Sequence, residues 1–223
     1  MATRLREEVA HLRSTGFLDA DHPRVMDFAR DAAIGRADTI GRATALYYAV
    51  RDGIRYDPKH IDLRPDAMRA SSVLARGSGF CVAKAVLLAA ASRTLGIPSR
   101  LGFADVRNHL TTERMRRAMG TDLFVFHGYA ELHLEGCWVK ATPAFNRTLC
   151  ERFDVAPLEF DGRHDSLFQQ SDRTGRRYME YVRDHGAFDD LPLATIHAAF
   201  VEHYPALMAG AVYEVDGGDE WEP

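Results

Sequence analysis

The chain has 223 residues, of which 46% are hydrophobic and 27% charged, so it is long enough to bury one sizeable core and too apolar to be disordered. A count of 28 Lys and Arg against 32 Asp and Glu gives a formal net charge of −4, which argues against the basic excess that nucleic-acid binding needs. Three cysteines are too few for a disulfide framework, and no segment has the length and apolarity of a membrane span or signal peptide. We therefore expect a soluble, cytoplasmic protein with reduced thiols, no nucleic-acid partner and no membrane partner.

The N-terminal third is predicted to be helical. Apolar residues recur at helical spacing over residues 3–14 and 24–51, and Asp52 and Gly53 are expected to end the second segment. Residues 54–70 contain two prolines, which excludes a continuous helix and predicts a loop.

Residues 77–96 form the most strongly patterned segment. Their Ala-rich and Leu-rich composition, nearly free of charge, predicts a buried helix with Cys81 in its first turn and Gly96 as a left-handed stop. Backbone N–H groups at a helix start favour a thiolate, which is the form of cysteine that attacks carbonyl carbon. The alternative interpretation is that Cys81 is a small buried hydrophobic residue without a chemical role.

Three strands are expected after this helix. Residues 99–106 predict the first, and residues 123–134 and 137–142 predict two more, joined by a tight hairpin at Glu135 and Gly136. Further along the chain we expect a polar loop and helices over residues 175–185 and 193–209.

The hairpin separates its side chains into two faces if Leu134 pairs with Cys137. One face is apolar and reads as a core surface: Ala130, Leu132, Leu134, Cys137, Val139 and Ala141. The other gathers polar and aromatic groups: His127, Tyr129, Glu131, His133, Trp138, Lys140 and Thr142. A functional site on a rigid scaffold and a merely solvated face would both give this pattern.

Several simpler roles compete on the polar face. Glu131 is expected opposite Lys140 as a cross-strand ion pair, and His133 opposite Trp138 as a packing pair. A zinc site built from His127, Glu131 and His133 is the less favoured alternative, so we expect no metal. Cys137, on the core face, and Cys150 are interpreted as structural.

Three motifs in this order resemble those of the transglutaminase-like superfamily. GSGFCVAKAVLLAAASRTLGIPSR (77–100) is similar to its cysteine motif, and HGYAELHLEGCWVKATP (127–143) to its histidine motif. YAVRDGIRY (48–56) looks like the helix and exit that precede the cysteine motif.

The resemblance implies an α+β fold, a papain-like core in which the helix bearing Cys81 packs on an antiparallel sheet carrying His127. It covers about residues 44–146, leaving a helical N-terminal part (1–43) and a C-terminal extension (147–223) that we also expect to be helical, all within a single domain over residues 1–223.

The third catalytic position departs from the family pattern. Where the family has Asp, this chain has Thr142, whose hydroxyl could accept a hydrogen bond from the His127 ring but adds no negative charge. Papain-like proteases use a neutral Asn in this role, and Asn146 is a second candidate.

The predicted function is that of a cysteine enzyme without a cofactor. The resemblance implies that Cys81 forms a thioester with a peptide, protein or small amide and that His127 moves the proton, with hydrolysis favoured over acyl transfer. Tyr129, Glu131 and Trp138 are the candidate substrate-binding residues. The alternative is an inactive or weakly active module that binds peptides or proteins.

Overall fold

The computed structural model describes residues 9–109, 116, 119–167 and 178–209. Its helices are α2 (Pro23–Ala32), α3 (Thr39–Gly53), α4 (Ala70–Arg76), α5 (Cys81–Thr94), α7 (Arg147–Arg152), α8 (Leu193–His203) and α9 (Pro205–Met208), with a 3-10 turn at Pro65–Met68. Its strands are β1 (Arg55–Tyr56), β2 (Ser78–Gly79), β3 (Ser99–Asn108), β4 (Leu123–Leu134), β5 (Cys137–Ala141) and β6 (Met179–Phe188). Helices and an antiparallel sheet share one core, which confirms the predicted α+β class.

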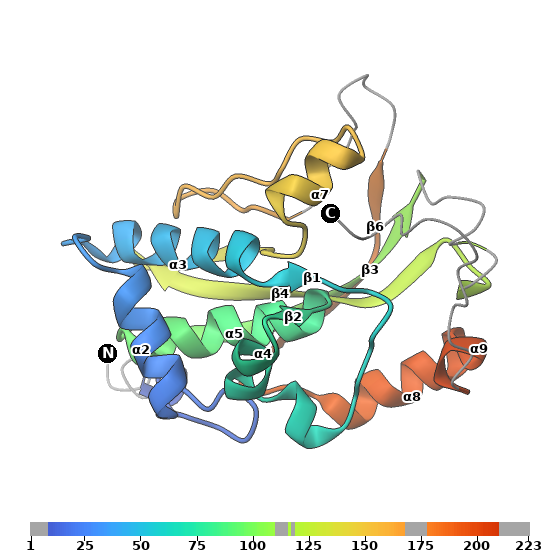
Figure 1. Cartoon of the computed structure of the whole chain (residues 1–223), viewed down its shortest axis with the longest axis horizontal. Coiled ribbons are helices and arrows are strands. Elements are labelled where there is room, and N and C mark those ends of the chain that lie inside the picture. The colour runs from blue at the N-terminus through green and yellow to red at the C-terminus, as the bar shows by residue number, and fades with distance from the viewer. Residues whose placement is uncertain (1–8, 110–115, 117–118, 168–177, 210–223) are drawn as a thin grey trace.

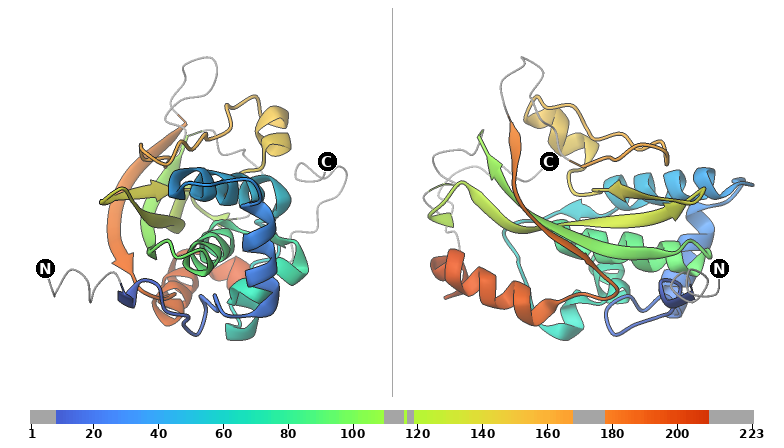
Figure 2. Two further views of the ribbon diagram at one scale, coloured as in Figure 1. Left: turned by 90° about the vertical axis from the view of Figure 1, so that its left-hand side faces the viewer. Right: turned by 180° about the vertical axis from the view of Figure 1, so that it is seen from behind.

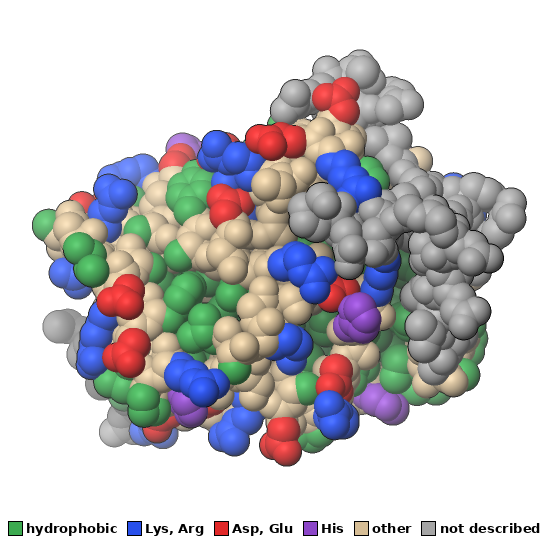
Figure 3. Space-filling model, viewed as in Figure 1, with side chains coloured by type: hydrophobic (Ala, Val, Ile, Leu, Met, Phe, Trp, Pro, Cys, Tyr) green, Lys and Arg blue, Asp and Glu red, His purple; other side chains and the backbone are tan. Residues whose placement is uncertain are grey.

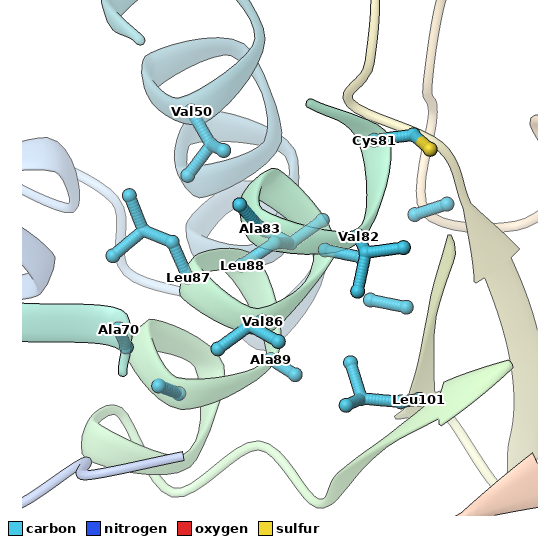
Figure 4. Packing of buried hydrophobic residues seen from close by; sticks show 14 of the residues in the cluster. Val50, Ala70, Cys81, Val82, Ala83, Val86, Leu87, Leu88, Ala89 and Leu101 are labelled. Carbon is cyan, nitrogen blue, oxygen red and sulfur yellow. The ribbon is translucent and has the colours of Figure 1, made fainter. Parts of the chain in front are cut away.

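Helix α5 lies at the centre of the molecule (Figures 1 and 2). One side packs on the four-stranded sheet, in which every neighbouring pair in the order β5-β4-β3-β6 is antiparallel, and the other side packs on α2, α3 and α4. Every residue from Cys81 to Arg93 is buried, and the many alanines allow this close approach on all sides (Figure 4). Gly96, at φ 74°, ends the helix as its left-handed stop, as predicted.

The hairpin follows the predicted register. Leu134 pairs with Cys137, His133 with Trp138 and Glu131 with Lys140, while Glu135 and Gly136 both adopt positive φ as a type I′ turn requires.

The segment before the cysteine motif, residues 48–56, helps to fix the position of α5. β1 runs parallel to β2, with Tyr56 opposite Gly79. Gly79 lies two residues before Cys81, so this pairing fixes Tyr56 beside the start of α5.

Two helix predictions in the terminal regions are corrected. Residues 24–51 form two helices rather than one, because Gly35 turns the chain at φ 76° and the Asp38 carboxylate caps α3 by accepting the Gly41 N–H. The predicted helix over 175–185 is wrong for its described part, since β6 begins at Met179 and pairs with β3. Its Tyr and Val residues are compatible with a strand or with a helix face, and the segment becomes a strand because it can pair with the free edge of β3. The C-terminal extension is therefore not purely helical.

A smaller correction concerns residues 193–209, where Tyr204 and Pro205 divide the predicted helix into α8 and α9. Of the predicted segment over 3–14, residues 3–8 lie outside the described residues, residues 9 and 10 are helical, and residues 11–14 are not. None of the helices in the described ranges is long and apolar enough to cross a membrane. On the face shown in Figure 3, acidic and basic side chains are interspersed around a patch of apolar ones.

Candidate active site

Cys81 occupies the first turn of α5, as predicted. The preceding residue, Phe80, has an extended backbone and offers no side-chain cap, so the first N–H groups of the helix are left to other acceptors. The backbone N–H groups of Cys81, Val82 and Gly128 lie near the Cys81 sulfur and act to lower the pKa of its thiol, and the sulfur points away from the packed helix toward the sheet (Figure 4). Three N–H donors around one sulfur make a cradle suited to a negatively charged atom.

The thiol nevertheless favours its neutral form. Burial raises the pKa of Cys81 to about 11, which outweighs the opposing effect of the three N–H groups. The N–H groups at the helix start do favour the thiolate, as expected, but burial has the larger effect. The backbone dipoles follow from the position of Cys81 in the sequence, whereas its desolvation depends on how the fold encloses the start of α5.

His127 lies on β4, opposite Ala104 of β3, and is also buried. Burial is the cause that lowers the pKa of its imidazole, to about 3. Thiol and imidazole are thus both neutral near pH 7. An attack on a carbonyl carbon would therefore begin with proton transfer from sulfur to imidazole rather than from a preformed ion pair.

Gly128 brings the two groups together. A Cβ atom built on Gly128 would lie only 2.9 Å from the Cα of Val82, so the backbones of α5 and β4 touch at the residue next to His127. Only a residue without a side chain permits this approach. The structure therefore places Cys81 and His127 on either side of a single contact between helix and strand.

Thr142 follows the last residue of β5 and is fully enclosed. Its N–H donates to the carbonyl of Ser166, at 2.9 Å, and its carbonyl accepts from the Tyr47 hydroxyl, at 3.1 Å. Its Oγ1 is buried and has no hydrogen-bond partner among the residues that the structure describes. Extending the hairpin register by one pair puts Thr142 opposite Tyr129, on the strand face that carries His127.

Asn146 has a different set of partners. Its Nδ2 donates to the carbonyls of Arg51 and Ile54, and its Oδ1 accepts the Tyr56 N–H at 2.6 Å. The amide thereby joins the end of α3 to β1. Of the two candidates for the third catalytic position, Thr142 is the one whose side-chain acceptor is not committed elsewhere in the described structure.

These partners predict opposite consequences for two alanine variants. Thr142→Ala is expected to slow acylation of Cys81 while leaving stability nearly unchanged, because it removes an acceptor for the imidazole. Asn146→Ala is expected to retain the rate and to cost about 1–3 kcal/mol in the free energy of unfolding, because it leaves the buried Tyr56 N–H without its acceptor. Urea unfolding and a rate measurement on both proteins decide the assignment. A loss of rate confined to Asn146→Ala would transfer the role to Asn146.

The candidate substrate-binding residues form a packed cluster on the sheet face opposite α5. The Arg100 guanidinium donates to Glu131 at 2.6 Å and lies 4.2 Å from the centre of the Trp138 ring. Tyr129 covers Gly102, with the Lys140 ammonium 5.1 Å from its ring. A substrate-binding role for Tyr129, Glu131 and Trp138 stays a prediction.

The ion pair expected between Glu131 and Lys140 is corrected by this cluster. The two residues are opposite one another as predicted, but Glu131 pairs with Arg100 on the other neighbouring strand, and Lys140 approaches Asp184 at 3.6 Å. Arg100 is preferred because its planar group can hydrogen-bond to the carboxylate and stack on Trp138 together. The end of the cysteine motif, Ser-Arg, was the available signal for this pairing.

The other cysteines also differ from one another. Cys137 is exposed at the hairpin turn, against the expectation that it faces the core, because the end of β5 is not covered there. Cys150 is buried, as a structural cysteine would be, beside Val155, Tyr178 and Met179.

Lys84 is a buried amine that no pattern in the sequence singled out. It lies in α5, three residues after Cys81, and its Nζ donates to the carbonyls of Arg51 and Ile54 at 2.9 and 2.6 Å. Desolvation lowers the pKa of this amine well below its usual value. Lys84 and Asn146 donate to the same two carbonyls and together bind the end of α3.

The loop over residues 161–166 reaches the site only with its last part. His164 and Asp161 form an exposed pair, while Ser166 bridges to Ala141 in parallel and so extends the edge of β5 beside Thr142. Within the described ranges, no group of three or more His, Cys, Asp or Glu side chains could hold a metal ion.

Comparison with known proteins agrees with the motifs. A family model described as the transglutaminase-like superfamily matches residues 27–143, more than half of the chain, and spans Cys81, His127 and Thr142. No curated protein matches. A solved structure from Cytophaga hutchinsonii, described as a putative cysteine protease, is 16% identical with a TM-score of 0.47; the alignment covers 60% of this chain and 41% of that one. On the family match, which confirms the resemblance drawn from the three motifs, the chain belongs to the transglutaminase-like superfamily.

Proposed function

We propose that the protein is a cysteine hydrolase that cleaves a peptide or amide bond through a thioester on Cys81. The observation that carries this proposal is the close contact between Gly128 and Val82, which brings the helix start at Cys81 against the strand that bears His127, with backbone N–H groups near the sulfur. Family membership supports a module of the cysteine-enzyme type. The alternative, a binding module without activity, draws on the Thr at the family's Asp position and on the neutral state of the buried thiol.

The reaction balances with Cys81 and His127 alone. The thiol proton passes to the imidazole as sulfur attacks the carbonyl carbon, and the oxyanion that forms lies near the N–H groups at the start of α5. The imidazolium then gives its proton to the leaving amine as the C–N bond breaks, which leaves a thioester. Water, losing a proton to His127, attacks the thioester carbonyl, and sulfur leaves with that proton as the acid is released. An amine in place of water would give transfer.

Acylation by an activated ester tests the proposal. With p-nitrophenyl acetate, wild-type protein is expected to release about one equivalent of p-nitrophenolate in a burst and to carry an acetyl group on Cys81 that hydroxylamine removes. Cys81→Ala should lose the burst, and His127→Gln should slow it by about 10²–10⁴-fold, the contribution of a general base. Digestion and mass spectrometry locate the acetyl group.

The exposed Cys137 supplies the matched control, because Cys137→Ser removes the thiol most accessible to nonspecific acylation. This variant should retain the burst in full. A burst that persists in Cys81→Ala and disappears in Cys137→Ser would refute the assignment and favour the binding module. Added methylamine separates hydrolysis from transfer, because only transfer yields N-methylacetamide faster than the uncatalysed reaction.

A further inference from the structure

The hydrogen-bonding register of β3 is interrupted near Ala104 in its pairing with β4 and in its pairing with β6. On β4, Ala104 pairs with His127 and Val106 with Phe124, so two residues of β4, Val125 and Phe126, stand opposite the single residue between them. Phe126 adopts φ 51°, a left-handed conformation that is strained for a bulky side chain. The extra residue in β4 therefore directly precedes His127.

A second bulge lies across β3 on the other neighbouring strand. Phe103 pairs with Gly186 and Ala104 with Asp184, which leaves His185 as the extra residue of β6. The rings of His185 and Phe126 stack with centres 3.9 Å apart and planes inclined by 16°. The two extra residues thus meet over β3.

Asp105 of β3 joins both bulges through one oxygen. Its Oδ1 accepts the Phe126 backbone N–H at 2.9 Å and the Nε2–H of His185 at 2.7 Å. The carboxylate is buried, so these two donors replace water around it. The Phe126 N–H, which the bulge removes from the regular ladder, keeps an acceptor only because Asp105 provides one.

The bulge decides which residue of β4 turns toward α5. Successive side chains along a strand alternate between faces, so one extra residue moves every later side chain to the opposite face. With the bulge in place, His127 shares a face with Tyr129 and Glu131, and Gly128 turns toward α5. Without it, Gly128 would turn away from α5, its contact with Val82 would be lost, and the backbone next to His127 would no longer meet the start of the helix that bears Cys81.

We propose that Asp105 and His185 are positioning residues: they lock the bulge at Phe126, which holds Gly128 against the start of α5 and so fixes His127 beside the Cys81 site. This assignment rests on the proposed function only in so far as His127 acts on Cys81. Neither side chain lies in the three motifs of the family resemblance, and both act through the backbone of Phe126 rather than on substrate.

The experiment compares Asp105→Ala, Asp105→Asn and His185→Ala in the Cys137→Ser background. Asp105→Ala is expected to lower the rate of Cys81 acetylation by p-nitrophenyl acetate by about 10²-fold, the effect of displacing a catalytic group by about 1 Å. Asp105→Asn keeps an oxygen that accepts the Phe126 N–H and should restore most of the rate. His185→Ala should lower the rate by less than Asp105→Ala, because the bond between Asp105 and Phe126 remains.

Asp19→Ala is the matched control. Asp19 is also a buried carboxylate that accepts a backbone N–H, that of Ser71 at 3.1 Å, but it holds α4 rather than β4. This variant should lose stability while keeping the acetylation rate. If Asp105→Ala fails to fold, the comparison of His185→Ala with Asp19→Ala carries the test, and equal rates in the two would overturn the proposal.

A second measurement separates this inference from the proposed function. ¹⁵N shifts of the labelled His127 imidazole report its tautomer and surroundings whether or not the protein is an enzyme. They should change in Asp105→Ala and stay unchanged in Asp19→Ala. If His127→Gln acetylates Cys81 at the wild-type rate, the proposed function alone is refuted. A folded Asp105→Ala protein with wild-type His127 shifts would refute the positioning role alone.

Discussion

Gly128→Ala is expected to lower acylation of Cys81 by at least about 10²-fold. The added Cβ would lie 2.9 Å from the Cα and 3.3 Å from the N atom of Val82, and backbone atoms cannot rotate aside as a side chain can. The start of α5 must therefore move away from β4, which separates Cys81 from the Gly128 N–H and from His127. Displacements of about 1 Å at a reacting group cost on the order of 10²-fold in rate.

The burst rate and the unfolding free energy should be measured together for this variant. Gly53→Ala, at the end of α3, is the control because a Cβ there meets no atom within 4 Å, and this protein should match the wild type in rate. Unchanged acylation in a folded Gly128→Ala protein would mean that the contact between helix and strand does not set the geometry of the site.

The wild-type protein is expected to lose about 3 kcal/mol more stability than His127→Gln between pH 7 and pH 4. Burial lowers the pKa of His127 to about 3 in the folded state, whereas the unfolded chain binds this proton near pH 6.5. Below pH 6.5 the unfolded state therefore holds more protons. The stabilisation is complete above pH 6.5 and is lost as the pH falls toward 3.

Urea unfolding at pH 7, 5 and 4 measures this effect, and the difference between wild type and His127→Gln cancels the contributions of other groups. His197, whose ring is exposed on α8, provides a control, and His197→Gln should follow the wild type across the range. Parallel curves for wild type and His127→Gln would show that the imidazole is solvated in the folded protein.

The parts of the structure that sequence analysis predicted are those with local signals. Helix α5 carries its own composition and its own stop at Gly96, and the hairpin register follows from two turn residues and alternating side chains. The cysteine and histidine motifs were therefore placed correctly on a helix and a strand. Strand β6 has no such local signal. Its residues form a strand because they pair with β3, which lies far earlier in the sequence.

The candidate site was predictable in its residue types but not in its energetics. Which carboxylate pairs with Arg100, how far burial shifts the pKa of Cys81, and which groups Asn146 binds all depend on contacts between distant segments. Asp105 stood in the sequence as an ordinary strand residue. Its role depends on the bulges in β4 and β6, and no residue spacing in the sequence predicts either bulge.

The place of β6 has a consequence for where the chain can be shortened. The family match ends at residue 143, yet β3 is flanked by β4 on one side and on the other by β6, which begins at Met179, beyond that match. A chain ended at the motif boundary would turn β3 into an edge strand with a row of unsatisfied backbone groups beside Leu101 and Phe103. Such an edge favours strand pairing between copies, so a fragment that carries the recognisable motifs should also include β6 if this edge of the sheet is to stay covered.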